Sequence, residues 1–90
     1  MATRFRNITG PGIRKARERA GFTQDQLAAK LQLAGLVNFD RVTVAKVEGQ
    51  IRSVYDYELV VVARVLKCEV IDLMPGRRAV DDALGDLVGG

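Results

Sequence analysis

Two basic side chains, Arg41 and Lys46, flank four small or β-branched residues near the middle of the chain. If this stretch is helical, Val44 and Val47 fall on its inner side. The opposite side then presents four side chains, Arg41, Val42, Ala45 and Lys46. A guanidinium and an ammonium on one face attract a polyanion. The alternative interpretation is an ordinary solvated helix surface, so the stretch alone leaves both readings open.

The placement of the charges favours a polyanionic partner. Residues 1–52 carry ten Lys/Arg and four acidic residues, a net charge of +6. Residues 53–90 carry four Lys/Arg and seven acidic residues, a net charge of −3, and the two parts add to the +3 of the whole chain. A basic first part and an acidic second part point to nucleic acid as the partner on one side.

Catalytic and metal-binding chemistry has little support in this composition. The 90 residues include no histidine and one cysteine, which excludes an intrachain disulfide and disfavours a zinc site or a histidine-based catalytic pair. The sequence also lacks a glycine-rich phosphate loop and a carboxylate constellation. We therefore expect no enzymatic activity and no cofactor, and we interpret Cys68 as a small core or boundary residue.

Composition and length predict one globular domain. Apolar residues make up 48% of the chain and charged residues 28%, values typical of a globular protein. No apolar run approaches the roughly 18 residues that a membrane span needs, and the N-terminus lacks an apolar signal core. We expect a cytoplasmic protein with no membrane partner.

Helix signals follow one another through the first half of the chain. Gly10-Pro11 favours a helix start, because proline at the first position loses an amide that has no partner there. Gly21 is a plausible left-handed stop. The sequence Thr23-Gln24-Asp25-Gln26 is a capping box that opens a second helix, and Gly35 can end it. The predicted apolar faces are Ile13, Ala16, Arg17 and Ala20 in the first helix and Leu27, Ala28 and Leu31 in the second.

Three further helices are predicted after residue 40. Asp40 is a good N-cap for a third helix over residues 41–48. A fourth helix starts near Asp56, and a short fifth runs from about Glu69 to Met74 before Pro75-Gly76. The predicted buried face of the fourth helix is Leu59, Val62, Ala63 and Leu66. We therefore predict an N-terminal arm (1–10), a helical domain (11–75) and a tail (76–90).

The tail has two readings. Val80, Ala83, Leu84, Leu87 and Val88 recur at helical spacing. One reading is a frayed, weakly helical end, which the glycines of the tail favour. The other is an amphipathic segment that docks on a second copy of the chain.

The ordered set of elements resembles the Cro/phage-repressor-like (XRE) helix-turn-helix family over about residues 8–75. The residues that carry the resemblance are Ile13-Arg14-x-x-Arg17, Gly21-Phe22-Thr23-Gln24-x-x-Leu27-Ala28, Val44-x-Lys46-Val47-Glu48, Arg52, Asp56-Tyr57-Glu58-Leu59 and Ala63-x-x-Leu66. The resemblance implies an all-α, five-helix repressor-like DNA-binding domain whose helix-turn-helix is formed by the second and third helices.

The sequence departs from the usual pattern at two points. An extra segment, residues 34–39, precedes Asp40, as in a longer-turn branch of the family, and this affects the angle at which the third helix meets DNA. We expect Leu36, Val37 and Phe39 to be buried enough to make this turn rigid. In addition, Gly49-Gln50 stands where family members often have a residue followed by glycine.

The resemblance implies a role for each candidate residue. The third helix would lie in the major groove, with Arg41 on guanine O6 and N7, Val42 and Ala45 near thymine methyl groups, and Lys46 on a base or phosphate. Thr23 and Gln24 would seat a phosphate or base at the second helix, and they also cap it. Arg52 would hold a phosphate, or pair with Glu48 or Asp56. The full DNA-binding set is Thr23, Gln24, Arg41, Val42, Thr43, Ala45, Lys46 and Arg52.

The resemblance also implies a structural pair. Arg17, on the apolar side of the first helix, and Glu48, at the end of the third, would form a partly buried ion pair that positions the recognition helix. The other cations would strengthen the positive electrostatic potential without making a fixed contact; they are Arg14, Lys15, Arg19 and Lys30.

Two functions of different classes follow. The leading one is a sequence-specific transcriptional regulator that binds double-stranded DNA by operator occupancy, as a homodimer on a two-fold site. The alternative is a helical protein-interaction module, such as an adaptor or antitoxin, whose main partner is a protein. An adaptor would more naturally expose larger apolar residues on the third helix than this sequence offers.

Overall fold

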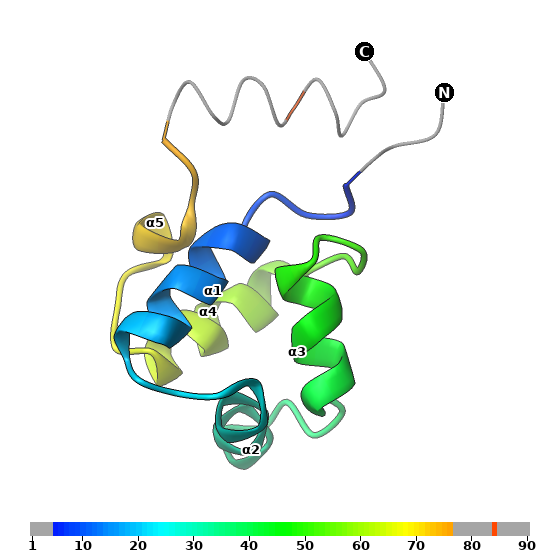
Figure 1. Ribbon diagram of the computed structural model, residues 1–90, viewed down its shortest axis with the longest axis vertical. Coiled ribbons are helices and arrows are strands. Elements are labelled where there is room, and N and C mark those ends of the chain that lie inside the picture. The colour runs from blue at the N-terminus through cyan, green and yellow to red at the C-terminus, as the bar shows by residue number, and fades with distance from the viewer. Residues whose placement is uncertain (1–4, 77–83, 85–90) are drawn as a thin grey trace.

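Helices and short connections make up the whole of the part of the chain that the structure describes. The structure is a computed structural model that describes residues 5–76 and Leu84. Its helices are α1 (Gly10–Arg19), α2 (Gln24–Leu33), α3 (Arg41–Glu48), α4 (Asp56–Val65) and α5 (Val70–Leu73) (Figure 1). These residues include no strand. The all-α prediction is therefore confirmed for them.

The helix starts follow the capping residues of the sequence. The Thr23 hydroxyl accepts a hydrogen bond from the Gln26 backbone N–H at 3.1 Å, and the Gln26 side chain accepts one from the Thr23 N–H at 2.8 Å. Asp40 accepts from the Thr43 N–H at 2.8 Å and caps α3. Because each cap binds an amide that the first helical turn leaves unpaired, it fixes where the helix begins.

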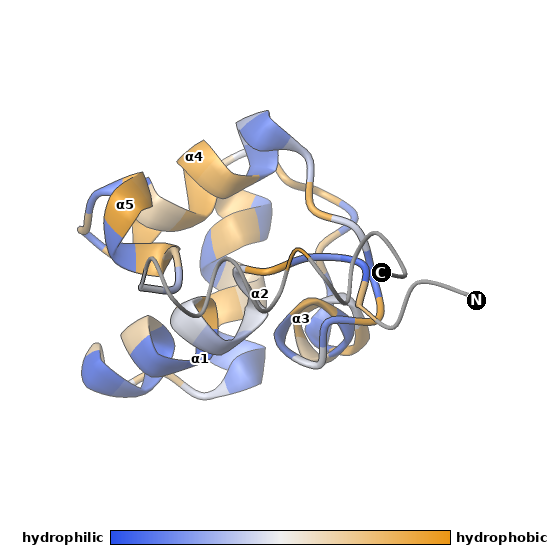
Figure 2. Cartoon of the chain, turned by 90° about the horizontal axis from the view of Figure 1, so that it is seen from above, coloured by the Kyte–Doolittle hydropathy of each residue, from blue (hydrophilic) through white to orange (hydrophobic). Residues whose placement is uncertain are grey.

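One apolar core joins all five helices. Its largest fully buried side chains are Ile13, Leu27, Leu31, Val44, Val62 and Leu73. The ribbon of α4 is coloured hydrophobic over most of its length, whereas the ribbon of α1 is mostly hydrophilic (Figure 2). One prediction of burial is wrong here, because Ala20 is exposed at the end of α1. Leu59 lies on the predicted face and is partly buried against the core. Ala20 is the C-cap of α1, one residue beyond the end of the helix.

A glycine brings α1 and α5 into close contact. A Cβ atom at Gly12 would overlap the carbonyl oxygen of Leu73, so only glycine fits at this crossing. Leu73 is fully buried there. The contact fixes the short α5, which has only four residues, against the start of α1.

The long turn between α2 and α3 is held by hydrogen bonds more than by burial. Phe39 is 2% exposed, but Leu36 is half-buried and Val37 is 72% exposed, so the prediction for Val37 is wrong. The Leu36 N–H donates to the Leu31 carbonyl at 2.9 Å, and the Gln32 side chain donates to the Phe39 carbonyl at 3.0 Å. These bonds fold the turn back on α2 and leave Val37 at its outer edge.

The described part of the predicted N-terminal arm is bound to the body of the protein. The Arg6 N–H donates to the Gln50 carbonyl at 2.8 Å, and the Asn7 side-chain amide donates to the carbonyls of Val47 and Arg52 at 3.0 and 2.7 Å. Helix α1 also begins at Gly10, inside the predicted arm. Residues 6–9 are therefore a strap across the end of α3.

The rest of the two predicted end segments lies outside the described residues. Residues 1–4, 77–83 and 85–90 belong to this group. Leu84 alone of the predicted tail beyond Gly76 is described; it is helical and 45% exposed. Within the described residues, none of the helices is long and apolar enough to cross a membrane.

Candidate nucleic-acid interface

Helix α3 turns its valines inward and its cations outward. Val44 and Val47 are each 2% exposed and belong to the core. Arg41, Ala45 and Lys46 are exposed, and Val42 is 54% exposed. This is the amphipathic arrangement that the spacing of the valines favours. The exposed face offers two cationic groups and two small apolar side chains to a ligand.

The Arg41 side chain lies near an acid of α2 without being buried by it. Its Nε is 3.9 Å from Asp25 Oδ1, with side-chain exposures of 63% and 76%. An exposed ion pair of this length contributes little to stability, so the guanidinium is free to exchange partners. The contact places the first turn of α2 beside the first turn of α3.

A buried ion pair holds the other end of α3. Arg17 Nε lies 2.6 Å from Glu48 Oε2 and Arg17 Nη2 lies 3.1 Å from Glu48 Oε1, which makes the pair bidentate. The side chains are 11% and 3% exposed. These hydrogen bonds to Glu48 raise the pKa of Arg17 above its ordinary value. The pair joins α1 to α3, as the resemblance implies.

Gln24 takes part in the same network. Its side-chain amide donates to Glu48 Oε1 at 3.1 Å. The second amide hydrogen and the carbonyl oxygen of Gln24 have no protein partner among the described residues, and the side chain is only half-buried. Glu48 therefore orients a polar group at the first turn of α2 while leaving part of it open to solvent.

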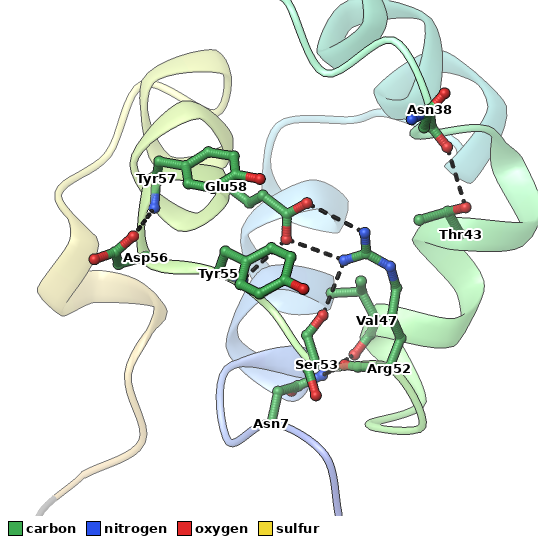
Figure 3. A network of polar contacts seen from close by, with 10 residues as sticks. All are labelled: Asn7, Asn38, Thr43, Val47, Arg52, Ser53, Tyr55, Asp56, Tyr57 and Glu58. Carbon is green, nitrogen blue, oxygen red and sulfur yellow. Dashed lines mark hydrogen bonds and ion pairs between the residues drawn. The ribbon is translucent and has the colours of Figure 1, made fainter.

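Thr43 faces the long turn more than the outer side of α3. Its N–H donates to the capping carboxylate of Asp40 at 2.8 Å. Its hydroxyl donates to the Asn38 carbonyl at 3.3 Å (Figure 3). Hydrogen bonds from Thr43, first of all from its backbone N–H, hold the pKa of the Asp40 carboxyl below its usual value. Thr43 thus fixes the start of the helix on which the exposed cations stand.

Arg52 pairs with Glu58, a different carboxylate from the two that were predicted. Its two terminal nitrogens donate to Glu58 Oε1 and Oε2 at 3.0 and 3.1 Å, and one also donates to the Ser53 carbonyl at 2.9 Å (Figure 3). The guanidinium carbon lies 4.7 Å from the centre of the Phe39 ring. The predicted pairing with Glu48 or Asp56 is wrong, because Glu48 is taken by Arg17 and Asp56 binds the Tyr57 N–H. Arg52 is a structural clamp between the long turn and α4.

Two further residues set the position of α3 and were missed in the sequence. Gln50 has φ +64°, in the left-handed region that favours glycine. Gly49, before it, has an ordinary helical φ of −81°. The Gln50 side chain donates to the Asn7 carbonyl at 3.0 Å, and Asn7 in turn binds the Val47 carbonyl. A polar residue at the left-handed position therefore ties the N-terminal strap to the end of α3.

The structure brings most of the predicted residues to one region. Arg41, Val42, Ala45 and Lys46 share the outer face of α3, and Thr23 and Gln24 lie at the start of α2, whose next residue approaches Arg41. Arg52 and Thr43 are engaged elsewhere. Cys68 is partly buried against the core, and burial raises the pKa of its thiol.

Comparison with known proteins gives no relative to set beside this site. No protein-family model, no curated protein and no solved structure matches the chain.

Proposed function

We propose that this protein is a sequence-specific DNA-binding transcriptional regulator that acts by occupying an operator. In this proposal α2 and α3 form a helix-turn-helix of the Cro/phage-repressor-like (XRE) kind with a longer turn, and α3 lies in the major groove. The observation that carries the proposal is the outer face of α3, where Arg41 and Lys46 are exposed beside Val42 and Ala45.

The composition of this face suits the edges of base pairs. The Arg41 fork matches the two acceptors of guanine, and Val42 and Ala45 are small enough to let a helix approach thymine methyl groups. Lys46 adds a cation that reaches a base or a phosphate. A major groove about 12 Å wide admits an α-helix, so a single helix such as α3 can bring these side chains to the base edges.

In this proposal the first turn of α2 supplies a phosphate-binding site. The N-terminus of a helix directs unpaired amides and the positive end of the helix dipole at an anion. Gln24, which Glu48 holds in place, adds a side-chain donor there. The contact between Arg41 and Asp25 supports a shared approach of both helix starts to one backbone segment.

A second candidate function is a helical protein-interaction module. Large apolar side chains are exposed away from α3, among them Leu33 at 90% and Ile71 at 74%. The outer face of α3, by contrast, has one exposed branched apolar residue, Val42. This distribution supports nucleic acid as the proposed ligand of α3 and favours other surfaces for any protein contact.

Selection from a pool of random DNA duplexes tests the proposal. Bound molecules are recovered over several rounds and sequenced, with a short motif expected to emerge, two-fold symmetric if the protein binds as a dimer. Binding to the selected duplex is expected to weaken steeply with added salt, because phosphate contacts release counterions. A pool that remains random after selection would refute sequence-specific binding.

A further inference from the structure

An apolar groove lies between the C-terminal ends of α2 and α4. The groove has a volume of about 360 Å³, and Ala34 is one of the residues that line it. Its apolar wall is formed by Leu33 of α2 and by Val61 and Val65 of α4. Leu33 is 90% exposed, so this wall is open to solvent. Covering the exposed leucine and the two half-buried valines would remove apolar surface from water, which is energetically favourable.

The rim of the groove is uniformly basic. Lys30, Arg64 and Lys67 surround the apolar wall. Among the described residues the ion pairs involve Arg14, Arg17, Arg41 and Arg52, so none of the three rim cations is paired with an acid there. Three like charges around one hollow repel one another and attract an acidic partner. The groove thus favours an apolar segment that carries negative charges.

The sequence contains a segment of this chemistry. Between residues 79 and 90 the apolar residues recur at i, i+3, i+4, i+7 and i+8, namely Val80, Ala83, Leu84, Leu87 and Val88. The charged residues of the segment are Asp81, Asp82 and Asp86. Leu84, the one residue of the segment that the structure describes, is helical and 45% exposed. In a helical conformation the segment would have an apolar stripe and its acidic residues outside that stripe, which is chemistry complementary to a basic-rimmed apolar groove.

We infer that the groove binds residues 79–90 of a second copy of this chain, so that two copies exchange their C-terminal segments. Residues 74–76 lie near one end of the longest axis and α2 lies at the other (Figure 1). Only residues 77 and 78 would connect Gly76 to a helix in the groove, and two extended residues span about 7 Å. The segment therefore suits a neighbouring copy better than its own groove. Reciprocal exchange gives a two-fold dimer.

This dimer would leave the α3 face uncovered. No residue of α3 lines the groove. The inference is therefore independent of DNA binding, and its test is done without DNA. Failure of the dimer test would leave the proposed function untouched, and a failed DNA selection would leave the dimer untouched.

Two charge-reversed variants of the full chain test the inference by analytical ultracentrifugation. The rim variant carries Lys30→Glu, Arg64→Glu and Lys67→Glu. The tail variant carries Asp81→Lys, Asp82→Lys and Asp86→Lys. The wild type is expected to dimerise, and each variant alone to dimerise at least about tenfold more weakly. Mixing the two is expected to restore dimers, because each groove then meets a tail of opposite charge.

A matched control and an apolar variant complete the test. The control carries Arg14→Glu, Lys15→Glu and Arg19→Glu, which makes the same change in net charge on α1 and is expected to dimerise like the wild type. Leu33→Asp removes the exposed leucine without touching the core and is expected to abolish dimers. Circular dichroism checks that each variant is folded. A monomeric wild type up to about 1 mM, or variants that stay monomeric when mixed, would overturn the inference.

Discussion

Arg17 of α1 and Glu48 of α3 face each other through two hydrogen bonds, at 2.6 and 3.1 Å, and their side chains are only 11% and 3% exposed. Arg17 also donates to the Phe22 carbonyl at 2.8 Å, so one guanidinium joins α1, the turn before α2 and the end of α3. Each of the three guanidinium nitrogens of Arg17 therefore donates a hydrogen bond within the protein. This pair sets the position of the outer face of α3 relative to α1.

Removing one partner of this pair leaves a buried charge. We expect Glu48→Ala to lower the free energy of unfolding by about 3–5 kcal/mol, because the Arg17 guanidinium loses its counter-ion in a buried position. The double variant Arg17→Met/Glu48→Met, which removes both charges, is expected to be more stable than Glu48→Ala. Urea unfolding measures both. An unfolding midpoint for Glu48→Ala equal to that of the wild type would show that the pair does not stabilise the fold.

The Asp40 cap makes the stability of α3 depend on pH. Hydrogen bonds from Thr43 lower the pKa of Asp40 in the folded protein. The folded pKa lies below the unfolded one, so the stabilisation is fully present above the unfolded pKa and is lost as the pH falls through the folded pKa. Asparagine can accept the same hydrogen bond but carries no charge. We expect wild type to melt at a higher temperature than Asp40→Asn at neutral pH.

The difference between these two proteins is expected to shrink as the pH is lowered from about 5 to about 2, because Asp40 then becomes neutral as well. Thermal melts of wild type and Asp40→Asn over this range measure the gap. A gap that stays constant from neutral pH to the acid end would contradict the charged cap.

Helix boundaries were predictable from the sequence because the signals are local. Thr23 and Asp40 each bind an amide three residues away, and Gly21 and Gly35 adopt the positive φ values, 80° and 113°, that end α1 and α2. The inward side of α3 was predictable for the same reason, since Val44 and Val47 are three residues apart. Residue type and spacing alone are therefore enough to predict these helix boundaries and the inward side of α3.

The contacts that position α3 were not predictable in this way, because they join distant parts of the chain. The Asn7 amide meets the Arg52 carbonyl 45 residues away. The partner of Arg52 is Glu58, whose side chain is buried, and not Asp56, which is nearer in the sequence. Val37 has the residue type of a core position, yet the hydrogen bonds of the turn direct it outward. Each of these outcomes depends on the packing of elements that the sequence alone does not place.

The Arg52 clamp predicts a stability effect without a change in base preference. The Glu58 side chain is 6% exposed and loses two charged hydrogen bonds in Arg52→Ala. We expect a loss of about 2 kcal/mol in the free energy of unfolding. The relative affinities for different DNA duplexes are expected to stay the same. A change in base preference would instead place Arg52 at the DNA bases.

The most direct test compares Arg41→Ala with Arg14→Ala on the selected duplex and its single-base variants. The two arginines are matched, because each side chain is 63% exposed and each forms one long ion pair, at 3.9 and 3.7 Å. Arg41→Ala is expected to lose about 1–3 kcal/mol of discrimination at one base pair. Arg14→Ala is expected to weaken all duplexes alike. If Arg41→Ala keeps both the affinity and the base preference of the wild type, α3 does not read DNA through this face.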